Sequence, residues 1–480
     1  MHDLHQTHSP MLIAGKPVDS DRGIEVRNPF TGELVGTVPQ AEPHHIRKAF
    51  AAAGRARPRL TRRERTDILL GTASAIRKER DHLARLITAE TGLCLKDSLY
   101  ETSRACDVFT FAAHVLTQSD GEVFPCDVGS NPHHRRIFSM RTPLNGAISA
   151  ITPFNHPLNL VSHKLAPAIA TNNRVVLKPS EQAPLTALAL GRLLYDQGLP
   201  EDMLSIVTGM PHGMGDAMFT DPDAELVTFT GSVRVGYHIA ERAGYRKLVL
   251  ELGGNDAFIV LEDADVGRAA YLAVQGAMKN SGQRCTAVKR VLVVDSIADE
   301  FAEHALRHTA ALATGDPSDP SVDVGTVISR EAAELIARRV AAAVASGAVV
   351  RLGGQPNGAF YPPTLLDHVS PTTELVAEET FGPVLPIIRC PNDVDEIISI
   401  ANASRFGLSA GVCSNRLDYV LKFVDGLAVG TVNVWEVPGY RTELTPFGGI
   451  KDSGLGHKEG VLEAMRSFTQ VKTYSLPWPA

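Results

Sequence analysis

The sequence predicts an α/β protein with two lobes. From residue 146 onward, short β-rich runs alternate with segments of helical length, which is the pattern of βαβ units and a parallel sheet. A second alternation of the same kind starts at residue 256, so we place the seam between the lobes near residues 252–256. The length of 480 residues suits two or three domains with a large core.

Before the first alternation, residues 45–120 are expected to be helical. The run DILLGTASAIRKERDHLARLITAETG has apolar residues at spacings of three and four and ends at Gly92, a plausible C-terminal stop. Residues 122–141 have little helical pattern and are predicted to form an extended excursion. The tail SFTQVKTYSLPWPA, residues 467–480, has the pattern of a terminal strand without a local partner. Such an edge often pairs with another subunit.

The strands of the first lobe are expected in the runs GAISAITPFN, NRVVLKPS, LSIVTG, LVTFTGS and KLVLELGGN. Those of the second lobe are expected in DAFIVL, RVLVVD, GAVVRLGG and TVNVW. In open parallel sheets, ligands bind at the carboxyl ends of the strands. The residues that follow these runs are therefore candidates for a site.

The composition is ordinary for a soluble globular protein, with 44% hydrophobic and 21% charged residues. The net charge of −7 is spread along the chain and gives no nucleic-acid footprint. The six cysteines form no CxxC pair, which indicates free thiols in a reducing compartment. The chain shows no signal peptide and no membrane span, so we expect a cytoplasmic protein. We interpret His2, His5 and His8 as part of a flexible start and expect no metal site.

One cysteine has unusual neighbours. In NSGQRCTAVKR, Cys285 directly follows Arg284, and Lys289 and Arg290 come soon after. Nearby cations favour the thiolate, so Cys285 is a candidate nucleophile. A buried core cysteine is the commoner fate of a single cysteine, and the pattern alone leaves both interpretations open.

Two strand ends carry possible phosphate or ribose contacts. Gly231 and Ser232 follow an apolar strand and precede a helical run, where free amides and a close backbone approach suit a pyrophosphate. The spacing is not GxGxxG, and alone it favours a plain strand-to-helix turn. Lys178, Ser180 and Glu181 end another strand, where a lysine or glutamate reaches ribose hydroxyls; a solvated loop is the alternative.

Two further residues suit acid–base and oxyanion chemistry. Glu251 ends a strand before two glycines, and a partly desolvated carboxylate there could act as a general base. The alternative is a surface glutamate beside a turn. Asn155 follows a strand in ITPFNHPLN, where a side-chain amide held in a loop could donate to an oxyanion. Its alternative is an ordinary turn residue before Pro157.

Taken together, these segments form one ordered set. An asparagine in PFN, then KPSE, FTGS, ELGGN and GQRC, is followed by EETFGPV and PFGGIKDSGLG. The set resembles the aldehyde dehydrogenase superfamily over nearly the whole chain. The resemblance implies a Rossmann-like cofactor domain, an α/β catalytic domain and a small β oligomerisation arm.

The resemblance also implies domain limits. Residues 1–121 and 145–253, with 441–467 returning, would form the NAD-binding domain. Residues 254–440 would form the catalytic domain. Residues 122–144 and 468–480 would form the arm, in a homodimer or a homotetramer.

For the chemistry, the resemblance implies that Cys285 is the nucleophile. Its thiolate would add to an aldehyde, and loss of hydride would leave a thioester that water hydrolyses. Asn155 and the backbone amide of Cys285 would stabilise the oxyanion. Glu251 would activate the water. A catalytically dead structural relative is the alternative from another class, but all three residues are present.

For the cofactor, the resemblance assigns Lys178 and Glu181, with Ser180 beside them, to the adenosine ribose. Ser232, with Gly231 before it, would contact the pyrophosphate. Glu379 and Phe381 of EETFGPV would hold the nicotinamide ribose and ring. The carboxylate of Glu181 should repel a 2′-phosphate, which favours NAD over NADP, although Lys178 and Ser180 could still accept it.

The side chains expected in the pocket wall are cationic or potentially cationic. Arg284 precedes the nucleophile, His156 follows the oxyanion asparagine, Arg104 lies on the helix YETSRACDVFTF, and Arg441 lies before PFGG. Converging cations predict a small anionic aldehyde, because the arginine fork matches phosphate and carboxylate geometry. Local likeness within the superfamily favours phosphonoacetaldehyde. Succinate semialdehyde, glyceraldehyde 3-phosphate and lactaldehyde are the alternatives.

Overall fold

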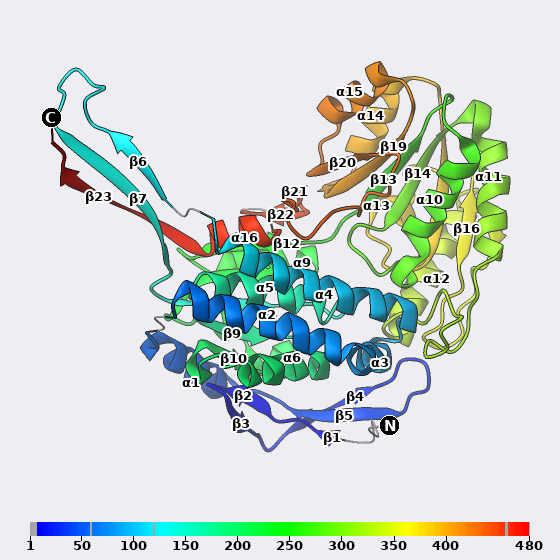
Figure 1. The fold of residues 1–480 in the computed structure, drawn as a ribbon. Coiled ribbons are helices and arrows are strands. Elements are labelled where there is room, and N and C mark those ends of the chain that lie inside the picture. The colour runs from blue at the N-terminus through cyan, green and yellow to red at the C-terminus, as the bar shows by residue number, and fades with distance from the viewer. Residues whose placement is uncertain (1–6, 58–59, 119–120, 457–458, 480) are drawn as a thin grey trace.

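A computed structural model describes residues 7–57, 60–118, 121–456 and 459–479. Two α/β units pack side by side, and a three-stranded arm extends away from them (Figure 1). The predicted α/β class is confirmed. Of the three early histidines, His2 and His5 lie outside the described residues, whereas His8 belongs to strand β1 (Thr7–His8).

The first unit is built on an eight-stranded sheet. Its strands are β2 (Met11–Ile13), β3 (Lys16–Val18), β8 (Ala147–Ile151), β9 (Val175–Lys178), β10 (Leu204–Ile206), β11 (Ala224–Thr230), β12 (Lys247–Glu251) and β22 (Gly454–Leu455). Their order is β22-β12-β11-β8-β9-β10-β2-β3. The strands from β12 to β10 run parallel, so the carboxyl ends of the predicted runs meet at one edge.

Helices cover both faces of this sheet because its parallel strands are apolar on both sides. Val175 and Leu177 pack into one core and Val176 into the other, as the two-residue period of a strand requires. The helices are α1 (Pro43–Arg55), α2 (Arg62–Lys78), α3 (Arg80–Thr91), α4 (Leu95–Val115), α5 (Asn159–Ala170), α6 (Pro184–Asp196), α7 (Pro211–Met214), α8 (Ala217–Thr220), α9 (Val233–Arg242) and α16 (Val461–Ser467), with a 3₁₀ turn η1 (Glu201–Met203).

The helical stretch expected over residues 45–120 is divided into α1 to α4. Thr61 caps α2 by accepting a hydrogen bond from the Glu64 amide, and Glu64 bonds back in a capping box. Gly92 ends α3 in the left-handed conformation (φ 71°), as the sequence predicted. The next helix, α4, begins beside the second unit, where the Leu95 amide donates to the Pro317 carbonyl at 2.8 Å.

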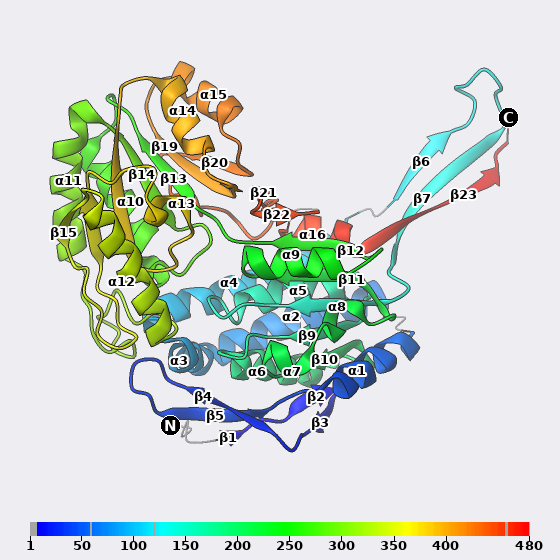
Figure 2. The ribbon, with the colours of Figure 1, turned by 180° about the vertical axis from the view of Figure 1, so that it is seen from behind.

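The second unit holds a seven-stranded sheet in the order β15-β16-β17-β14-β13-β19-β20. Its strands are β13 (Asp256–Val260), β14 (Val288–Val294), β15 (Val349–Leu352), β16 (Thr364–Asp367), β17 (Val384–Cys390), β19 (Ser409–Cys413) and β20 (Thr431–Val434). Its helices are α10 (Val266–Met278), α11 (Asp295–Ala310), α12 (Arg330–Ala345), α13 (Glu374–Ala377), α14 (Val394–Asn402) and α15 (Leu417–Gly426), with a 3₁₀ turn η2 (Lys279–Gly282). They cover both faces of this sheet as well (Figure 2).

Smaller strands complete the fold. β1, β4 (Gly23–Arg27) and β5 (Leu34–Pro39) form a separate sheet at the N-terminal side, and β18 (Phe406–Gly407) pairs with β21 (Ile450–Lys451). Among the residues that the structure describes, no helix is long and apolar enough to cross a membrane.

The arm brings together two segments that are far apart in sequence. The tail strand β23 (Thr469–Pro477) has no local partner, but it pairs antiparallel with the remote strand β7 (Arg135–Pro143) along its whole length. In turn, β7 pairs with β6 (Gly121–Pro125), so the predicted excursion is a hairpin to which the tail adds a third strand. This partner is more than 300 positions away in sequence, and no local pattern signals such a pairing.

Candidate active site

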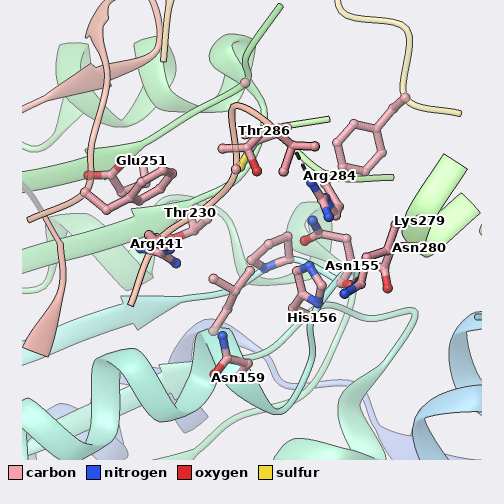
Figure 3. A pocket seen from close by; sticks show the side chains of 18 of the residues that line it. Asn155, His156, Asn159, Thr230, Glu251, Lys279, Asn280, Arg284, Thr286 and Arg441 are labelled. Carbon is pink, nitrogen blue, oxygen red and sulfur yellow. Dashed lines mark hydrogen bonds between the residues drawn. The ribbon is translucent and has the colours of Figure 1, made fainter. Parts of the chain in front are cut away.

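A cavity of about 610 Å³ opens where loops of the two units meet. Most of the sequence-predicted residues line it: Arg104, Asn155, His156, Gly231, Ser232, Glu251, Arg284, Cys285, Glu379, Phe381 and Arg441. Figure 3 shows several of these side chains facing a common space. Lys178, Ser180 and Glu181 do not line the cavity; they lie at the end of the neighbouring strand β9.

The segment before the candidate nucleophile is a strained turn. Asn280, Ser281 and Gly282 are all left-handed, with φ of 61°, 52° and 69°. A residue with a side chain pays roughly 1–3 kcal/mol to stay in this conformation. A Cβ at position 282 would lie 2.0 Å from the Gly382 carbonyl oxygen, so only glycine fits there. The turn leads directly into the segment that places Cys285 in the cavity wall.

Cys285 is half-buried, and its thiol is not activated by its neighbours. Burial, followed by the carboxylates of Glu379 and Asp256, raises the pKa of Cys285 to about 12. The cations beside Cys285 in the sequence, which suggested a thiolate, do not cancel this rise in its pKa. Lys289 and Arg290 are buried and donate to backbone carbonyls instead. Cys285 thus lines a cavity, as a nucleophile must, but its thiol is protonated at neutral pH.

Asn155 is buried and tied to the nucleophile segment by two hydrogen bonds. Its Nδ2 donates to the Gln283 carbonyl at 2.9 Å, and its own carbonyl accepts from Asn280 Nδ2 at 2.9 Å. An amide nitrogen has two hydrogens, so one remains for an oxyanion. This geometry suits the predicted oxyanion donor and is not that of a plain turn residue.

Glu251 ends β12 inside the cavity wall and is 4% exposed, so it is not a surface glutamate. Burial raises its pKa well above the usual range, and the nearby Glu459 adds to this effect. Glu459 itself is ionised, because the buried Lys164 donates to it at 2.6 Å. Within the described residues, Oε2 of Glu251 has no hydrogen-bond partner and is free to take a proton from water.

The candidate cofactor residues fit a dinucleotide. Ser232 caps α9, accepting from the Val235 amide at 3.4 Å, and Gly231 precedes it, so the start of the helix lies in the cavity wall, where a phosphate could bind. Glu379 accepts from the Gly254 amide at 3.1 Å. A Cβ at Gly253 would lie 2.3 Å from Glu379 Oε2, so a larger residue there would require the carboxylate to shift. A nicotinamide ring bound beside these residues would be the group that accepts the hydride.

Lys178 and Glu181 form an ion pair at 2.8 Å at the end of β9. The Ser180 hydroxyl beside them accepts from the Gln182 amide. Both Lys178 and Ser180 are buried, whereas Glu181 is more exposed. This cluster lies one strand from the cavity, since β9 pairs with β8, which leads to Asn155.

Arg104 is not a free cation. Its Nε donates to Glu443 Oε1 at 2.5 Å, and the other oxygen of Glu443 contacts His163 Nε2 at 2.5 Å. Burial raises the pKa of the Glu443 carboxyl, but its cationic partners outweigh that and hold it far below the usual range. Much of the positive charge of Arg104 is therefore offset within the protein.

His156 is not a cation either. Burial lowers its pKa, although Glu101 Oε2 lies 3.4 Å from Nδ1 and acts in the opposite direction. The lowered pKa favours the neutral form of this potentially cationic side chain at neutral pH. Its imidazole faces the cavity as a neutral hydrogen-bonding group.

Arg284 and Arg441 are the cations with unused hydrogen-bond donors. In the described part of the chain, Nε of Arg284 and Nη1 of Arg441 are buried without partners. Arg441 stacks on Phe447 at 3.9 Å. Arg284 lies close to Gly439, where a Cβ would stand 2.9 Å from its Nη2. A buried unpaired guanidinium N–H costs free energy, which an anionic ligand would recover.

Comparison with known proteins agrees with this geometry. The model of the aldehyde dehydrogenase family matches residues 17–474. The chain belongs to the aldehyde dehydrogenase family. It is 36% identical to a 3-sulfolactaldehyde dehydrogenase of Priestia aryabhattai over 463 residues, 96% of each chain. It is 35% identical to a lactaldehyde dehydrogenase of Methanococcus aeolicus over 470 residues, 96% of this chain and 99% of that one.

Among solved structures, it resembles the NADP-dependent glyceraldehyde-3-phosphate dehydrogenase of Bacillus halodurans, complexed with NADP. The TM-score is 0.94 at 34% identity, over 99% of this chain and all of the other. The chain is therefore an NAD(P)-dependent aldehyde dehydrogenase.

Some residues of this aldehyde dehydrogenase cavity were missed by the sequence reasoning. Lys279 lines the wall with its ammonium 3.6 Å from the centre of the Tyr100 ring, and Asp97 lies beside them. Asp97, Tyr100 and Arg104 lie three or four residues apart on α4, so the helical period could have identified this face from Arg104 alone. No sequence pattern identifies Lys279 as a cavity residue, because it lies after the end of α10 and directly before the strained turn.

The raised thiol pKa gives this aldehyde dehydrogenase a testable pH dependence. Only the thiolate reacts with iodoacetamide, and below the pKa its fraction rises tenfold per pH unit. The pKa of Cys285 is raised to about 12, so the rate at which iodoacetamide alkylates Cys285 should keep rising between about pH 7 and 10. Peptide mass spectrometry measures this rate. A plateau above about pH 8 would contradict the raised pKa. The half-buried Cys126, on the arm, is alkylated in the same sample and serves as the internal control for the reagent.

Proposed function

We propose that this enzyme oxidises a small anionic aldehyde to its acid, with phosphonoacetaldehyde as the favoured substrate. The observation that carries the proposal is the pair of unpaired guanidinium nitrogens, on Arg284 and Arg441, in the cavity that Cys285 also lines. The ammonium of Lys279 adds a third positive charge to the wall. An oxyacid head group with several acceptor oxygens would pair with the guanidinium groups that line this wall.

The cavity residues supply the steps on either side of hydride loss. Once deprotonated, Cys285 Sγ would bond to the aldehyde carbon, and the carbonyl oxygen would become an oxyanion. Asn155 Nδ2 and the Cys285 amide would stabilise that charge. After the hydride has left, Glu251 would take a proton from water as it attacks the thioester, which releases the acid and the thiol.

For the cofactor, NAD is proposed over NADP. The carboxylate of Glu181 is the more exposed member of its ion pair, and it would repel a 2′-phosphate. Because Lys178 already pairs with Glu181, its charge is less available to that phosphate.

A sulfonated aldehyde is the second candidate substrate, because a relative named a 3-sulfolactaldehyde dehydrogenase matches along 96% of this chain. Succinate semialdehyde, glyceraldehyde 3-phosphate and lactaldehyde complete the set. The deciding experiment measures kcat/KM for each of these aldehydes with NAD and with NADP. A higher kcat/KM for uncharged lactaldehyde than for every anionic aldehyde would contradict the proposal.

Replacing Arg284 with alanine tests how the substrate charge is recognised. A charge-assisted hydrogen bond contributes about 1.5–3 kcal/mol, so kcat/KM for the anionic substrate should fall roughly 10- to 150-fold. Lactaldehyde should lose much less, or gain. Steady-state kinetics on both substrates measure the difference.

Arg104 provides the matched comparison, since Glu443 already pairs with it. Arg104→Ala and His156→Ala should discriminate less sharply between charged and uncharged aldehydes than Arg284→Ala does. Equal losses for both substrates in all three variants would leave the anion pocket unsupported.

We also propose that the arm joins subunits into a homodimer or homotetramer. Its surface exposes apolar side chains, among them Val123, Phe124, Val471, Tyr474 and Trp478. The outer edge of β23 is unpaired among the described strands, so it is open to a further strand. Sedimentation analysis of the whole protein would show a monomer if this is wrong.

A further inference from the structure

One face of helix α4 contacts three segments of the active site. Asp97 Oδ2 accepts from the Asn280 amide at 2.8 Å, in the turn before Cys285. Glu101 Oε1 accepts from the amides of Leu158 and Asn159, at 2.8 and 2.9 Å, just after the oxyanion asparagine. Arg104 holds Glu443, in the loop of Arg441. The three α4 residues are four and three positions apart, which is the spacing of one helical face.

From this arrangement we propose that Asp97 is a positioning residue for the nucleophile and the oxyanion donor. The segment from Asn280 to Gly282 is left-handed at every residue, a conformation that persists only where the surroundings enforce it. The carboxylate of Asp97 enforces it from outside the turn, at the turn's first amide.

The effect reaches the reacting atoms through two further hydrogen bonds. Asn280 Nδ2 donates to the Asn155 carbonyl, and Asn155 Nδ2 donates to the Gln283 carbonyl, two residues before Cys285. Asn280 is 2% exposed, so without Asp97 its amide would be buried with no acceptor. The turn would then relax, and both Asn155 and Cys285 would shift.

The charge of Asp97 has a separate effect from its hydrogen bond. The carboxylate interacts electrostatically with Arg284 and Lys279 and offsets part of their positive charge. Asparagine would keep an acceptor oxygen but lose this charge, whereas alanine would lose both. The Asn and Ala variants therefore separate positioning of the turn from the charge balance of the cavity.

The experiment compares Asp97→Ala, Asp97→Asn and Asp97→Glu in the full-length enzyme. Misplacement by about 1 Å costs on the order of 100-fold in rate, so kcat of Asp97→Ala should fall by roughly that factor, with KM for lactaldehyde little changed. Asp97→Asn should recover most of the lost kcat. Asp97→Glu keeps the charge but moves the oxygens, so its kcat should fall as well.

Glu90 is the matched structural control. It is 1% exposed, accepts from the amides of Leu185 and Thr186, and lies outside the cavity. Glu90→Ala should lower the Tm but leave kcat per folded molecule near the parental value. The alkylation rate of Cys285 by iodoacetamide at fixed pH gives a readout independent of any substrate. It should change in Asp97→Ala and remain near the parental value in Asp97→Asn and Glu90→Ala.

Two outcomes would overturn the proposal. One is a kcat of Asp97→Ala equal to that of Glu90→Ala, and the other is a kcat of Asp97→Asn as low as that of Asp97→Ala. Where Asp97→Ala does not fold, Asp97→Glu decides: a parental kcat rejects the positioning role, and a lowered kcat at parental Tm supports it. None of these outcomes depends on which aldehyde is the natural substrate.

Discussion

Replacing Cys285 with serine should abolish aldehyde oxidation, with kcat falling by roughly four orders of magnitude or more. The serine hydroxyl is a far weaker nucleophile than a thiolate, and no base is placed to activate it. Glu251 lines the same cavity, but burial raises the pKa of its carboxyl well above the usual range, which lowers the fraction that is ionised and can act as a base. The rate of NADH formation measures the loss of activity. Calorimetry should show that NAD binding is largely unchanged.

Cys126→Ser is the control for general effects of removing a thiol, because Cys126 lies in the arm, in the loop that follows β6, and should leave kcat unchanged. Residual turnover of Cys285→Ser within tenfold of the parent enzyme would reject Cys285 as the nucleophile.

Replacing Glu251 with glutamine should separate two halves of the reaction. Glutamine keeps the size of the side chain but cannot take a proton from water. If Glu251 serves mainly deacylation, rapid mixing with NAD and aldehyde should give about one NADH per active site, followed by turnover slowed about 10²- to 10⁴-fold.

A trace with neither burst nor turnover would instead place Glu251 in activation of the thiol. The parent enzyme should also become faster with rising pH, because the pKa of Glu251 is raised and the base must be ionised. Glu251→Gln should lose that part of the pH dependence.

The parts of the site that follow strands were predictable, because a strand end fixes where the next side chain lies. Asn155 and Gly231 follow β8 and β11, and Glu251 ends β12; these strands are parallel neighbours, so the three residues converge at one sheet edge. The fold class followed from the same strand and helix periods. In these cases the local pattern and the tertiary arrangement agree.

Pairing and ionisation were not predictable, because they depend on partners far apart in sequence. Arg104 has the residue type of a substrate contact, yet Glu443, 339 positions away, pairs with it. Cys285 has cations beside it in sequence, yet burial decides the pKa of its thiol. The partner of the tail strand is equally remote. A sequence names the charged groups of a site, but desolvation and long-range contacts decide which of them remain available.

The single face of α4 also limits how this pocket can change during evolution. Inserting or deleting one residue between Asp97 and Arg104 would turn the rest of the helix by about 100°. At least one of these side chains would then lose its hydrogen-bond partner in the active site. Length changes in this helix should therefore be excluded, while the loops around it remain free to vary. Divergence toward other aldehydes is expected to proceed through substitutions at its exposed positions, such as Tyr100, with the helix kept at constant length.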